Sequence, residues 1–291
     1  VAALSLPNET CGWGILAGFG QGVCGGAAPY FIRTVNGTTW NGGAISLPAD
    51  ITPWSISAIN KDTAWIAACN NSDNTSGYIY KTTNGGNNWT QQSTANAADA
   101  LRFVHFFNAN QGVAVGDSST FITNDGGANW VFNGALPVPV AMIGSGRTIF
   151  LLNCYEVVGN TIWLGDSYGY FYKSTDQGMT WTLITNGINS SIKGIAFKDT
   201  LHGMAVASRW NTGGGSGGGF AEDFSVMTSD GGASWQAMPI LFNSVTVGSN
   251  AAKYDVAYVP GTNNTYIAGS EYDISSTFTA ITTDGGLSWS L

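Results

Sequence analysis

The sequence predicts an all-β protein, a six-bladed β-propeller whose blades are four-stranded antiparallel sheets. One short motif recurs six times at intervals of about 40 to 55 residues, which indicates a repeat architecture. The composition, with 40 Gly and 10% charged residues, is typical of turn-rich β structure. Helical spacing of apolar residues is absent. Seven blades are the alternative, but they would need a blade without the motif, and the chain has no residues left for one.

The repeat motif reads Thr or Ser, any residue, Asp or Asn, any residue, Gly, two further residues and Trp. Its acid or amide positions are Asn36, Asn84, Asp125, Asp176, Asp230 and Asp284, and its tryptophans are Trp40, Trp89, Trp130, Trp181, Trp235 and Trp289. The Asp or Asn side chain closes a turn on the amides two residues on, and Gly supplies a positive φ. The Trp then opens the next strand with a large apolar side chain. The motif therefore predicts a hairpin turn between the third and fourth strands of each blade, and its role is structural.

The second repeat shows the order of strands. An apolar alternation through Ile56 and Ala58 is followed by a polar turn at 60–63 and a second strand at 65–68. A third strand at 77–81 leads into the motif, and a fourth begins at Trp89. The same frame divides the chain, taken as one domain over 1–291, into six blades. Their approximate ranges are 1–47, 48–96, 97–140, 141–188, 189–245 and 246–291. In the fourth blade we expect a longer first turn around Glu156.

The motif resembles the Asp-box, or BNR repeat, of sialidases, sortilin-type receptors, xyloglucanases and a photosystem II assembly factor. The likeness is sharpest over residues 103–130, FVHFFNANQGVAVGDSSTFITNDGGANW, which resemble the repeats of the assembly factor and of many secreted bacterial proteins. The resemblance covers nearly the whole chain and implies a β-propeller. These families differ in function, so the resemblance implies no single activity.

Charge and composition exclude several classes of partner. The net charge of −8 argues against nucleic acid, because phosphate binding needs a basic surface. No run of 18 apolar residues is present, so no membrane span is expected. The first residues read as a mature start from which an export signal has been removed. We therefore expect a secreted or cell-surface bacterial protein, of the kind found in Bacteroidetes.

The four cysteines are Cys11, Cys24, Cys69 and Cys154, and four cysteines allow three pairings. A disulfide between Cys11 and Cys24 is the local choice, and buried free thiols are the alternative. The chain lacks a CxxC pair and has two histidines, so neither a metal site nor a cofactor is expected.

Catalytic residues are hard to assemble from this sequence, so no catalytic site is predicted. A sialidase needs three arginines and a Tyr–Glu pair, yet the chain has four arginines, and Tyr155 and Glu156, as strand neighbours, face opposite ways. Other glycan hydrolases need two opposed carboxylates. The candidates are Asp117, Glu156, Asp166, Glu222, Asp223, Glu271 and Asp273. Asp117 and Asp166 follow Gly at the end of a second strand, where a turn-closing role is expected for both. A hydrolase of sialidase or xyloglucanase type remains the alternative function.

One pattern stands out from the scaffold. The residue entering the first strand of a blade is basic in four blades and Trp in another, and these residues are Trp54, Arg102, Arg147, Lys193 and Lys253. We expect them at one mouth of the propeller, where a concentrated positive field would bind an anionic group such as a carboxylate of a glycan or peptide. The alternative is that these charges limit aggregation at strand edges.

These observations predict a non-catalytic binding or scaffold protein that presents one propeller face to a protein or glycan partner at a cell surface. A passenger of a type IX secretion system, or an adhesin, fits that description. Thr63 and Thr200 lie in Asp-Thr-aliphatic triplets that resemble the O-glycosylation signal of exported Bacteroidetes proteins. We expect both threonines on exposed first turns.

Overall fold

A computed structural model describes residues 3–16, 19–20, 23–24, 29–70, 72–73, 75–94, 99–137, 150–185, 188, 190–211, 220–238, 253–271 and 277–290. All regular structure in these residues is β-strand. The chain forms two compact units, the first comprising 1–136 with 177–179 and the second 137–176 with 180–291. Within the described part, no helix has the length and hydropathy needed to cross a bilayer.

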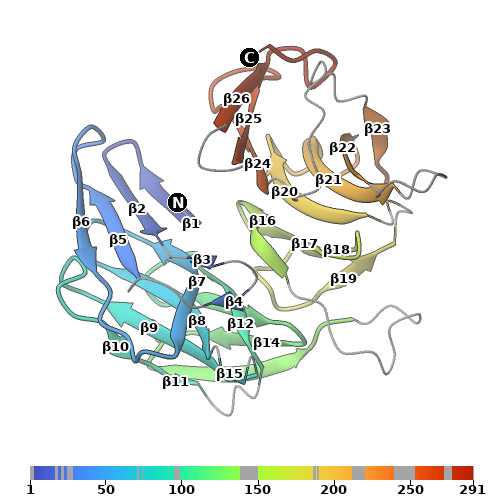
Figure 1. The fold of residues 1–291 in the computed structure, drawn as a ribbon. Coiled ribbons are helices and arrows are strands. Elements are labelled where there is room, and N and C mark those ends of the chain that lie inside the picture. Colours follow the sequence, from blue (N-terminus) through green and yellow to red (C-terminus); the bar gives the residue numbers. More distant parts are fainter. Residues whose placement is uncertain are drawn as a thin grey trace. The chain divides into compact units, whose positions relative to one another are not determined.

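Each unit contains three blades in sequence order (Figure 1). The first unit has β1 (Ala3–Asn8), β2 (Cys11–Leu16), β5 (Tyr30–Thr34) and β6 (Trp40–Ala44); β7 (Ile51–Ala58), β8 (Ala64–Asn70), β9 (Gly77–Thr82) and β10 (Thr90–Gln91); and β12 (Leu101–Phe106), β13 (Gly112–Gly116), β14 (Ser119–Thr123) and β15 (Asn129–Ala135). The second has β16 (Phe150–Val158), β17 (Thr161–Asp166), β18 (Phe171–Ser174) and β19 (Thr182–Ile184); β20 (Ser191–Phe197), β21 (Gly203–Asn211), β22 (Phe220–Thr228) and β23 (Gln236–Met238); and β24 (Lys253–Tyr258), β25 (Tyr266–Glu271) and β26 (Thr277–Thr282).

The predicted fold class, a six-bladed propeller of four-stranded antiparallel blades, is confirmed. Three details depart from a uniform blade. β3 (Phe19–Gly20) and β4 (Val23–Cys24) form a small extra hairpin, and β11 (Ser93–Thr94) runs parallel to β15 as a fifth strand of the third sheet. In the sixth blade a bridge between Ile281 and Ser290 stands where the fourth strand is expected.

The repeat motif forms the turn between the third and fourth strands, as its residues predict. In the third blade the Thr123 hydroxyl donates to Asp125 Oδ1 at 2.8 Å and accepts the Gly127 N–H at 3.0 Å. Asp125 Oδ1 also accepts the N–H of Asn129 at 2.9 Å, so the acid reaches four residues on, where the sequence had suggested two. Gly126 and Gly127 both have positive φ, 72° and 89°, which Gly adopts without steric cost.

The motif tryptophan packs backwards onto the preceding blade. Trp89 of the second blade meets the ring of Trp13 edge-on at 6.2 Å, and Trp235 of the fifth stacks on Phe171 of the fourth at 4.6 Å. Trp40, in the shortened first copy of the motif, is 40% exposed. The motif therefore contributes to packing between blades as well as to the local turn.

A second joint between blades combines a tryptophan of the second strand with a cation of the third. Trp65 and Lys81 are cross-strand partners, with the ammonium 4.9 Å from the indole centroid. Both donate to one oxygen of the next blade, the Gly126 carbonyl, at 3.1 Å from Nε1 and 2.8 Å from Nζ. Because two N–H donors saturate this carbonyl away from water, the joint fixes the next turn against the blade.

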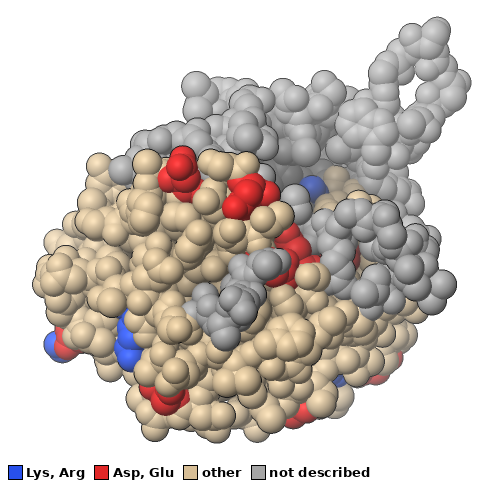
Figure 2. Space-filling model, turned by 90° about the horizontal axis from the view of Figure 1, so that it is seen from below, with Lys and Arg blue, Asp and Glu red and all other residues tan. Residues whose placement is uncertain are grey.

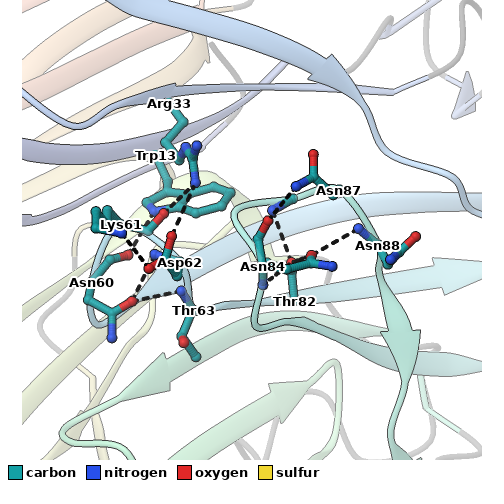
Figure 3. A network of polar contacts seen from close by, with 11 residues as sticks. Trp13, Arg33, Asn60, Lys61, Asp62, Thr63, Thr82, Asn84, Asn87 and Asn88 are labelled. Carbon is teal, nitrogen blue, oxygen red and sulfur yellow. Dashed lines mark hydrogen bonds and ion pairs between the residues drawn. The ribbon is translucent and has the colours of Figure 1, made fainter.

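The same joint recurs in the first and fourth blades. Trp163 and Lys173 both donate to the Gly231 carbonyl, at 3.0 and 2.8 Å. Trp13 donates to Asn60 O at 3.0 Å and Arg33 donates to Lys61 O, both in the first turn of the second blade (Figure 3). At the matched positions the third, fifth and sixth blades pair apolar side chains, which are Val113 with Ile122, Met204 with Met227 and Ile267 with Ile281.

We expect Trp65→Phe to lower the free energy of unfolding by about 1–3 kcal/mol, because the indole N–H to Gly126 is lost. Lys81→Met alone leaves the carbonyl with one donor. The double variant leaves it with none, so its loss should exceed the sum of the single losses by about 0.5–3 kcal/mol. Denaturant unfolding of the four proteins measures this coupling. Trp65→Phe combined with Lys173→Met, which act on different carbonyls, should be additive, and additivity in the first cycle would contradict the shared joint.

The aspartates of the repeat motif should also make the stability of the fold depend on pH. Hydrogen bonds from Asn129, Ser234 and Ser288 lower the pKa values of Asp125, Asp230 and Asp284 to about 2. A lowered folded-state pKa stabilises the fold above the unfolded pKa of about 4, and this contribution is lost as pH falls towards 2.

The variant Asp125→Asn with Asp230→Asn and Asp284→Asn should therefore show a shallower loss of thermal midpoint between about pH 4 and about pH 2 than the parent. Asn already occupies this place in the first two motifs, so the turn should tolerate it. Asp50→Asn, at an exposed position outside the motifs, is the control. If the thermal midpoints of the triple variant and the parent fall equally steeply below about pH 4, the proposed link between these carboxyl groups and stability is refuted.

Candidate functional site

Three of the five predicted binding residues lie at β-bulges of the innermost strands. The register shifts between Pro53 and Ser55 on β7, between Leu101 and Phe103 on β12, and between Ile192 and Gly194 on β20. The residues within these shifts are Trp54, Arg102 and Lys193. A bulge re-aims its extra side chain and is common beside functional sites. We call these three residues the bulge row.

In the first unit two members of the row meet. The guanidinium carbon of Arg102 lies 4.1 Å from the ring centroid of Trp54, a cation–π contact. Arg102 is 5% exposed and forms a forked ion pair with Asp117, Nε to Oδ1 at 3.1 Å and Nη2 to Oδ2 at 3.2 Å. Trp54 Nε1 donates to the buried Cys69 Sγ at 2.9 Å, and Arg102 Nη1 donates to the same sulfur at 3.4 Å. The cation that we expected at an open mouth is therefore enclosed and neutralised by Asp117.

A second carboxylate fixes the loop that carries Asp117. Asp99 Oδ2 accepts the backbone N–H groups of Ser118 and Ser119 at 2.7 and 2.8 Å and both of their hydroxyls. Asp99 is 9% exposed. The end of the second strand of the third blade is thus held by two acids, one binding the loop and one binding Arg102.

The other predicted cations are distributed differently. Lys193 is half-buried in the second unit, and its positive charge lowers the pKa of the Cys154 thiol against a larger rise from burial. Lys253 opens β24 opposite Glu271 without a bulge, and its side chain is outside the described residues. Arg147 also lies outside the described residues. The structure therefore brings together Trp54 and Arg102, and it gives Lys193 the equivalent backbone position.

Acidic groups gather along the inner strands of the second unit. Glu156 lies inside β16, so the expectation of a turn around this residue was wrong. Burial raises the pKa of Glu156 to about 7, and the negative charge of Asp255 on β24 raises it further, against two backbone hydrogen bonds. Loss of hydration at the Asp255 carboxyl raises its pKa to about 6, against a hydrogen bond from the Val256 N–H. Burial also raises the pKa of Tyr155, with smaller contributions from both carboxylates.

Sequence reasoning missed Asp255, because nothing in its neighbours marks it as different from the other aspartates. It also treated Asp117 and Asp166 as equivalent turn residues. Asp166 does close a turn, accepting the N–H groups of Tyr168 and Tyr170 at 2.8 and 2.9 Å. Asp117 instead pairs with Arg102. The strand register explains the difference, because Leu101 of β12 pairs with Gly116 whereas Phe150 of β16 pairs with Asp166, so the two acids are offset by one residue.

The remaining carboxylate candidates are not placed by the described residues. The side chains of Glu222, Asp223 and Glu271, and the whole of Asp273, lie outside the described residues. In the described part no cluster of three or more His, Cys, Asp or Glu side chains could hold a metal ion. Figure 2 shows one face of the molecule, on which most of the described surface is uncharged and the acidic and basic side chains form only small groups.

The cysteines favour the alternative of free thiols. Cys11, Cys69 and Cys154 are buried and free, and the Cys24 side chain is outside the described residues. The structure therefore does not contain the disulfide between Cys11 and Cys24. Cys11 packs in the core cluster of Trp13 and Phe31, where a thiol fits as a small apolar group.

The two threonines of the Asp-Thr-aliphatic triplets lie in equivalent first turns but at offset positions. Thr200 is exposed, and Thr63 is half-buried with its N–H bonded to Asn60. Gly85 donates to Asp62 O whereas Gly231 donates to Leu201 O, which shows an offset of two residues between the triplets.

Comparison with known proteins shows the fold and no family. No protein-family profile matches the chain, and no curated protein sequence matches it. Among solved structures, YCF48 bound to D1 peptide is similar over 99% of this chain and 80% of that chain, at 16% identity and a TM-score of 0.63. The GH74 xyloglucanase from Xanthomonas campestris is similar over 100% of this chain at 13% identity and a TM-score of 0.65, and the Niastella koreensis GH74 enzyme over 96% at 15% and 0.60. This chain spans 45% and 46% of those two enzymes.

The Arg102–Asp117 pair predicts a large cost for removing one partner. Arg102→Ala should lower the free energy of unfolding by about 3–5 kcal/mol, because Asp117 is then left desolvated without its cation. Replacing both, as Arg102→Met with Asp117→Leu, should recover most of that loss. Thermal unfolding measures both effects, with the exposed Lys61→Ala as the control. An unchanged midpoint for Arg102→Ala would show that the pair is not a structural element.

Proposed function

We propose that this protein is a non-catalytic binding or scaffold protein of the Asp-box family, secreted or held at a bacterial cell surface, which presents a propeller face to a protein or glycan partner. The Thr-Asp-Gly-Trp turns and their backward-packing tryptophans support the family assignment. The β-bulges of the inner strands at Trp54 and at Lys193 support a recognition role, because bulges recur beside functional sites.

The proposal that the protein is not catalytic rests on one observation: the described carboxylates are bound by groups of the protein itself. Asp125 accepts three hydrogen bonds within its own turn, Asp99 holds the Ser118–Ser119 loop, and Asp117 is paired with Arg102. An acid or base of a hydrolase must be able to exchange a proton with its substrate. Carboxylates that are saturated by turn amides and hydroxyls are poorly placed for that exchange.

A protein partner has one further support. YCF48, which shares the fold, was solved bound to a peptide, and it is similar over nearly all of this chain. At 16% identity this likeness concerns the fold, so the partner of this chain has to be argued from its own residues. In the second unit, the bulge on β20 that carries Lys193 suits a ligand with an acidic group.

The surface location rests on the sequence and on one exposed turn. Thr200 is exposed beside Asp199, whose carboxylate accepts the Leu201 and His202 N–H groups at 2.8 Å each. An ordered, exposed turn suits attachment of a glycan, and Thr63 is the second candidate. Such attachment, with export by a type IX system, is part of the proposal.

The hydrolase alternative is favoured by one observation, the raised pKa values of Glu156 and Asp255. A carboxyl group that stays protonated near neutral pH is what a general acid requires. Glu156, however, accepts two backbone N–H groups, from Val157 at 3.0 Å and from Phe197 at 3.4 Å, which ties it to the strands.

The binding proposal is tested by capture of partners from the native cell surface together with a glycan array. For the partner so identified, Lys193→Ala should weaken binding about tenfold or more, as loss of a charged contact does. Lys61→Ala, which removes an exposed cation outside the row, should leave the affinity unchanged. Equal affinities for the two variants would remove the bulge row from the proposal.

The purified parent protein should release no reducing sugar from xyloglucan and no sialic acid from sialoglycans. Hydrolysis that Glu156→Gln and Asp255→Asn abolish would instead establish the alternative function. Intact mass of the exported protein reports glycosylation, and a mass equal to that of the bare chain would overturn that part.

A further inference from the structure

One position of the third strand determines how a blade meets the motif turn of the next blade. In the second blade, Lys81 Nζ lies 3.4 Å from where a Cβ on Gly126 would stand, and it donates to the Gly126 carbonyl at 2.8 Å. In the fourth blade, Lys173 Nζ lies 2.6 Å from the corresponding place on Gly231 and donates to that carbonyl at 2.8 Å. The position therefore brings the end of a long side chain against the glycine that follows the motif acid.

In the fifth blade this position holds Met227, on β22. Met227 pairs with Met204 across the strands, as Lys81 pairs with Trp65. Its Cε lies 3.4 Å from where a Cβ on Gly285 would stand, at the same distance as Lys81 Nζ from the matched place. The methyl end of Met227 thus takes the place of a lysine ammonium beside the turn of the sixth blade. A thioether offers this turn an apolar contact and has no N–H to donate.

The two methionines differ in their access to solvent. Met204 is fully buried, whereas Met227 is half-buried. Both belong to the cluster of Val256 and Tyr266, which joins the fifth and sixth blades. The Met227 sulfur lies 3.6 Å from where a Cβ on Gly286 would stand, so it too is beside the motif turn. An oxidant in solvent therefore reaches the sulfur of Met227 more readily than that of Met204.

We propose that Met227 is an oxidation-sensitive joint between the fifth and sixth blades, at which hydrogen peroxide converts the thioether to a sulfoxide and loosens the turn that carries Gly285. The sulfur lone pair attacks one oxygen of the peroxide, and an S–O bond forms as the O–O bond breaks. The departing hydroxide takes the proton of the transferred oxygen and leaves as water. The thioether loses two electrons and the peroxide gains them. This regulation goes beyond the binding role proposed above.

The matched blades explain why a sulfoxide disturbs this joint. In the first, second and fourth blades the position holds a cation that donates to the next turn. In the third and sixth blades it holds an apolar side chain, Ile122 or Ile281. A sulfoxide oxygen is polar and accepts hydrogen bonds, and the carbonyl of Gly285, which corresponds to that of Gly126, is an acceptor as well. An S=O group at this place either stays without a donor or admits water to the joint, and both outcomes weaken the packing.

Hydrogen exchange of the full chain, before and after treatment with hydrogen peroxide, tests the proposal. The Gly285 amide donates to Asn264 O at 3.0 Å and reports the turn of the sixth blade. The Gly126 amide donates to Asn110 O at 2.8 Å and reports the matched turn of the third blade. Both amides lie in Asp-Gly-Gly sequences, so their intrinsic exchange rates are alike and cancel in the ratio. Oxidation of Met227, located by peptide mapping, should lower the protection of Gly285 relative to Gly126 about tenfold or more.

Two variants remove the thioether and keep an apolar side chain. Met227→Leu and Met227→Ile, of which the second matches the third and sixth blades, should make the ratio insensitive to peroxide, and one folded variant suffices. Met179→Leu is the control, because Met179 is 54% exposed and lies outside this joint, and it should respond to peroxide as the parent does. Treatment with a methionine sulfoxide reductase should restore the ratio in the oxidised parent.

Three results would overturn the proposal. The first is an unchanged ratio in a parent sample whose Met227 is oxidised. The second is a fall of the same size in Met227→Leu or Met227→Ile. The third is a Met227 that resists a peroxide concentration at which Met179 is fully oxidised.

Discussion

The structure depends on how each blade holds the turn of the next one. In three blades the device is one carbonyl oxygen, or two adjacent ones, that receives an indole N–H and a cation from the preceding blade. For Gly126 and Gly231 both donors converge on the same atom. Cation and ring also face each other, so three favourable contacts share one geometry. Where the pair is apolar, as with Val113 and Met204, side chains lie against the motif glycines Gly178 and Gly286. A Cβ at Gly178 would come within 2.5 Å of Val113, and both glycines have positive φ, 86° and 94°, which together favour Gly at these places.

The local part of this design was predictable from sequence and the long-range part was not. The motif residues act on atoms at most four positions away, so their spacing alone predicted the turns and the blade count. Trp65 and its acceptor Gly126 are 61 positions apart. Their relation depends on how consecutive blades pack, which no local pattern records. The bulges were predictable only in part. The sequence shows that Trp54, Arg102 and Lys193 occupy equivalent places in their blades, but it does not show the register shifts that occur there. The environments of Glu156 and Asp255 depend on burial and were invisible for the same reason.

The use of charge follows from the scarcity of charged residues, at 10% of the chain. Arg33, Lys81 and Lys173 bind backbone carbonyls of the next blade, and Arg102 is enclosed with Asp117. A cation that binds a backbone carbonyl or a buried carboxylate contributes little to the electrostatic field at the protein surface. The basic residues that enter the first strands were expected either to bind an anion at a mouth of the propeller or to limit aggregation at strand edges. Arg102 fits neither, because its charge is used inside the protein. Lys193 has the same backbone setting in the second unit and is half-buried, so it is the member of the row that we propose for an outside ligand.

In a repeat protein, equivalent positions of different blades can be compared with one another, so a residue that differs from its equivalents is informative. Six blades solve one packing problem, so a residue type that recurs at a matched place reports what the fold requires there. One such place lies on the inner strand, opposite the tryptophan of the second strand or its equivalent. Ser5, Ser57 and Glu156 accept an N–H of the next blade at this place. The fifth and sixth blades hold Ala196 and Ala257 there, so the fold tolerates the bridge without requiring it. A glutamate at that place costs desolvation without improving the bridge, since its bond to Phe197 is longer than the bond from Phe106 to Ser57.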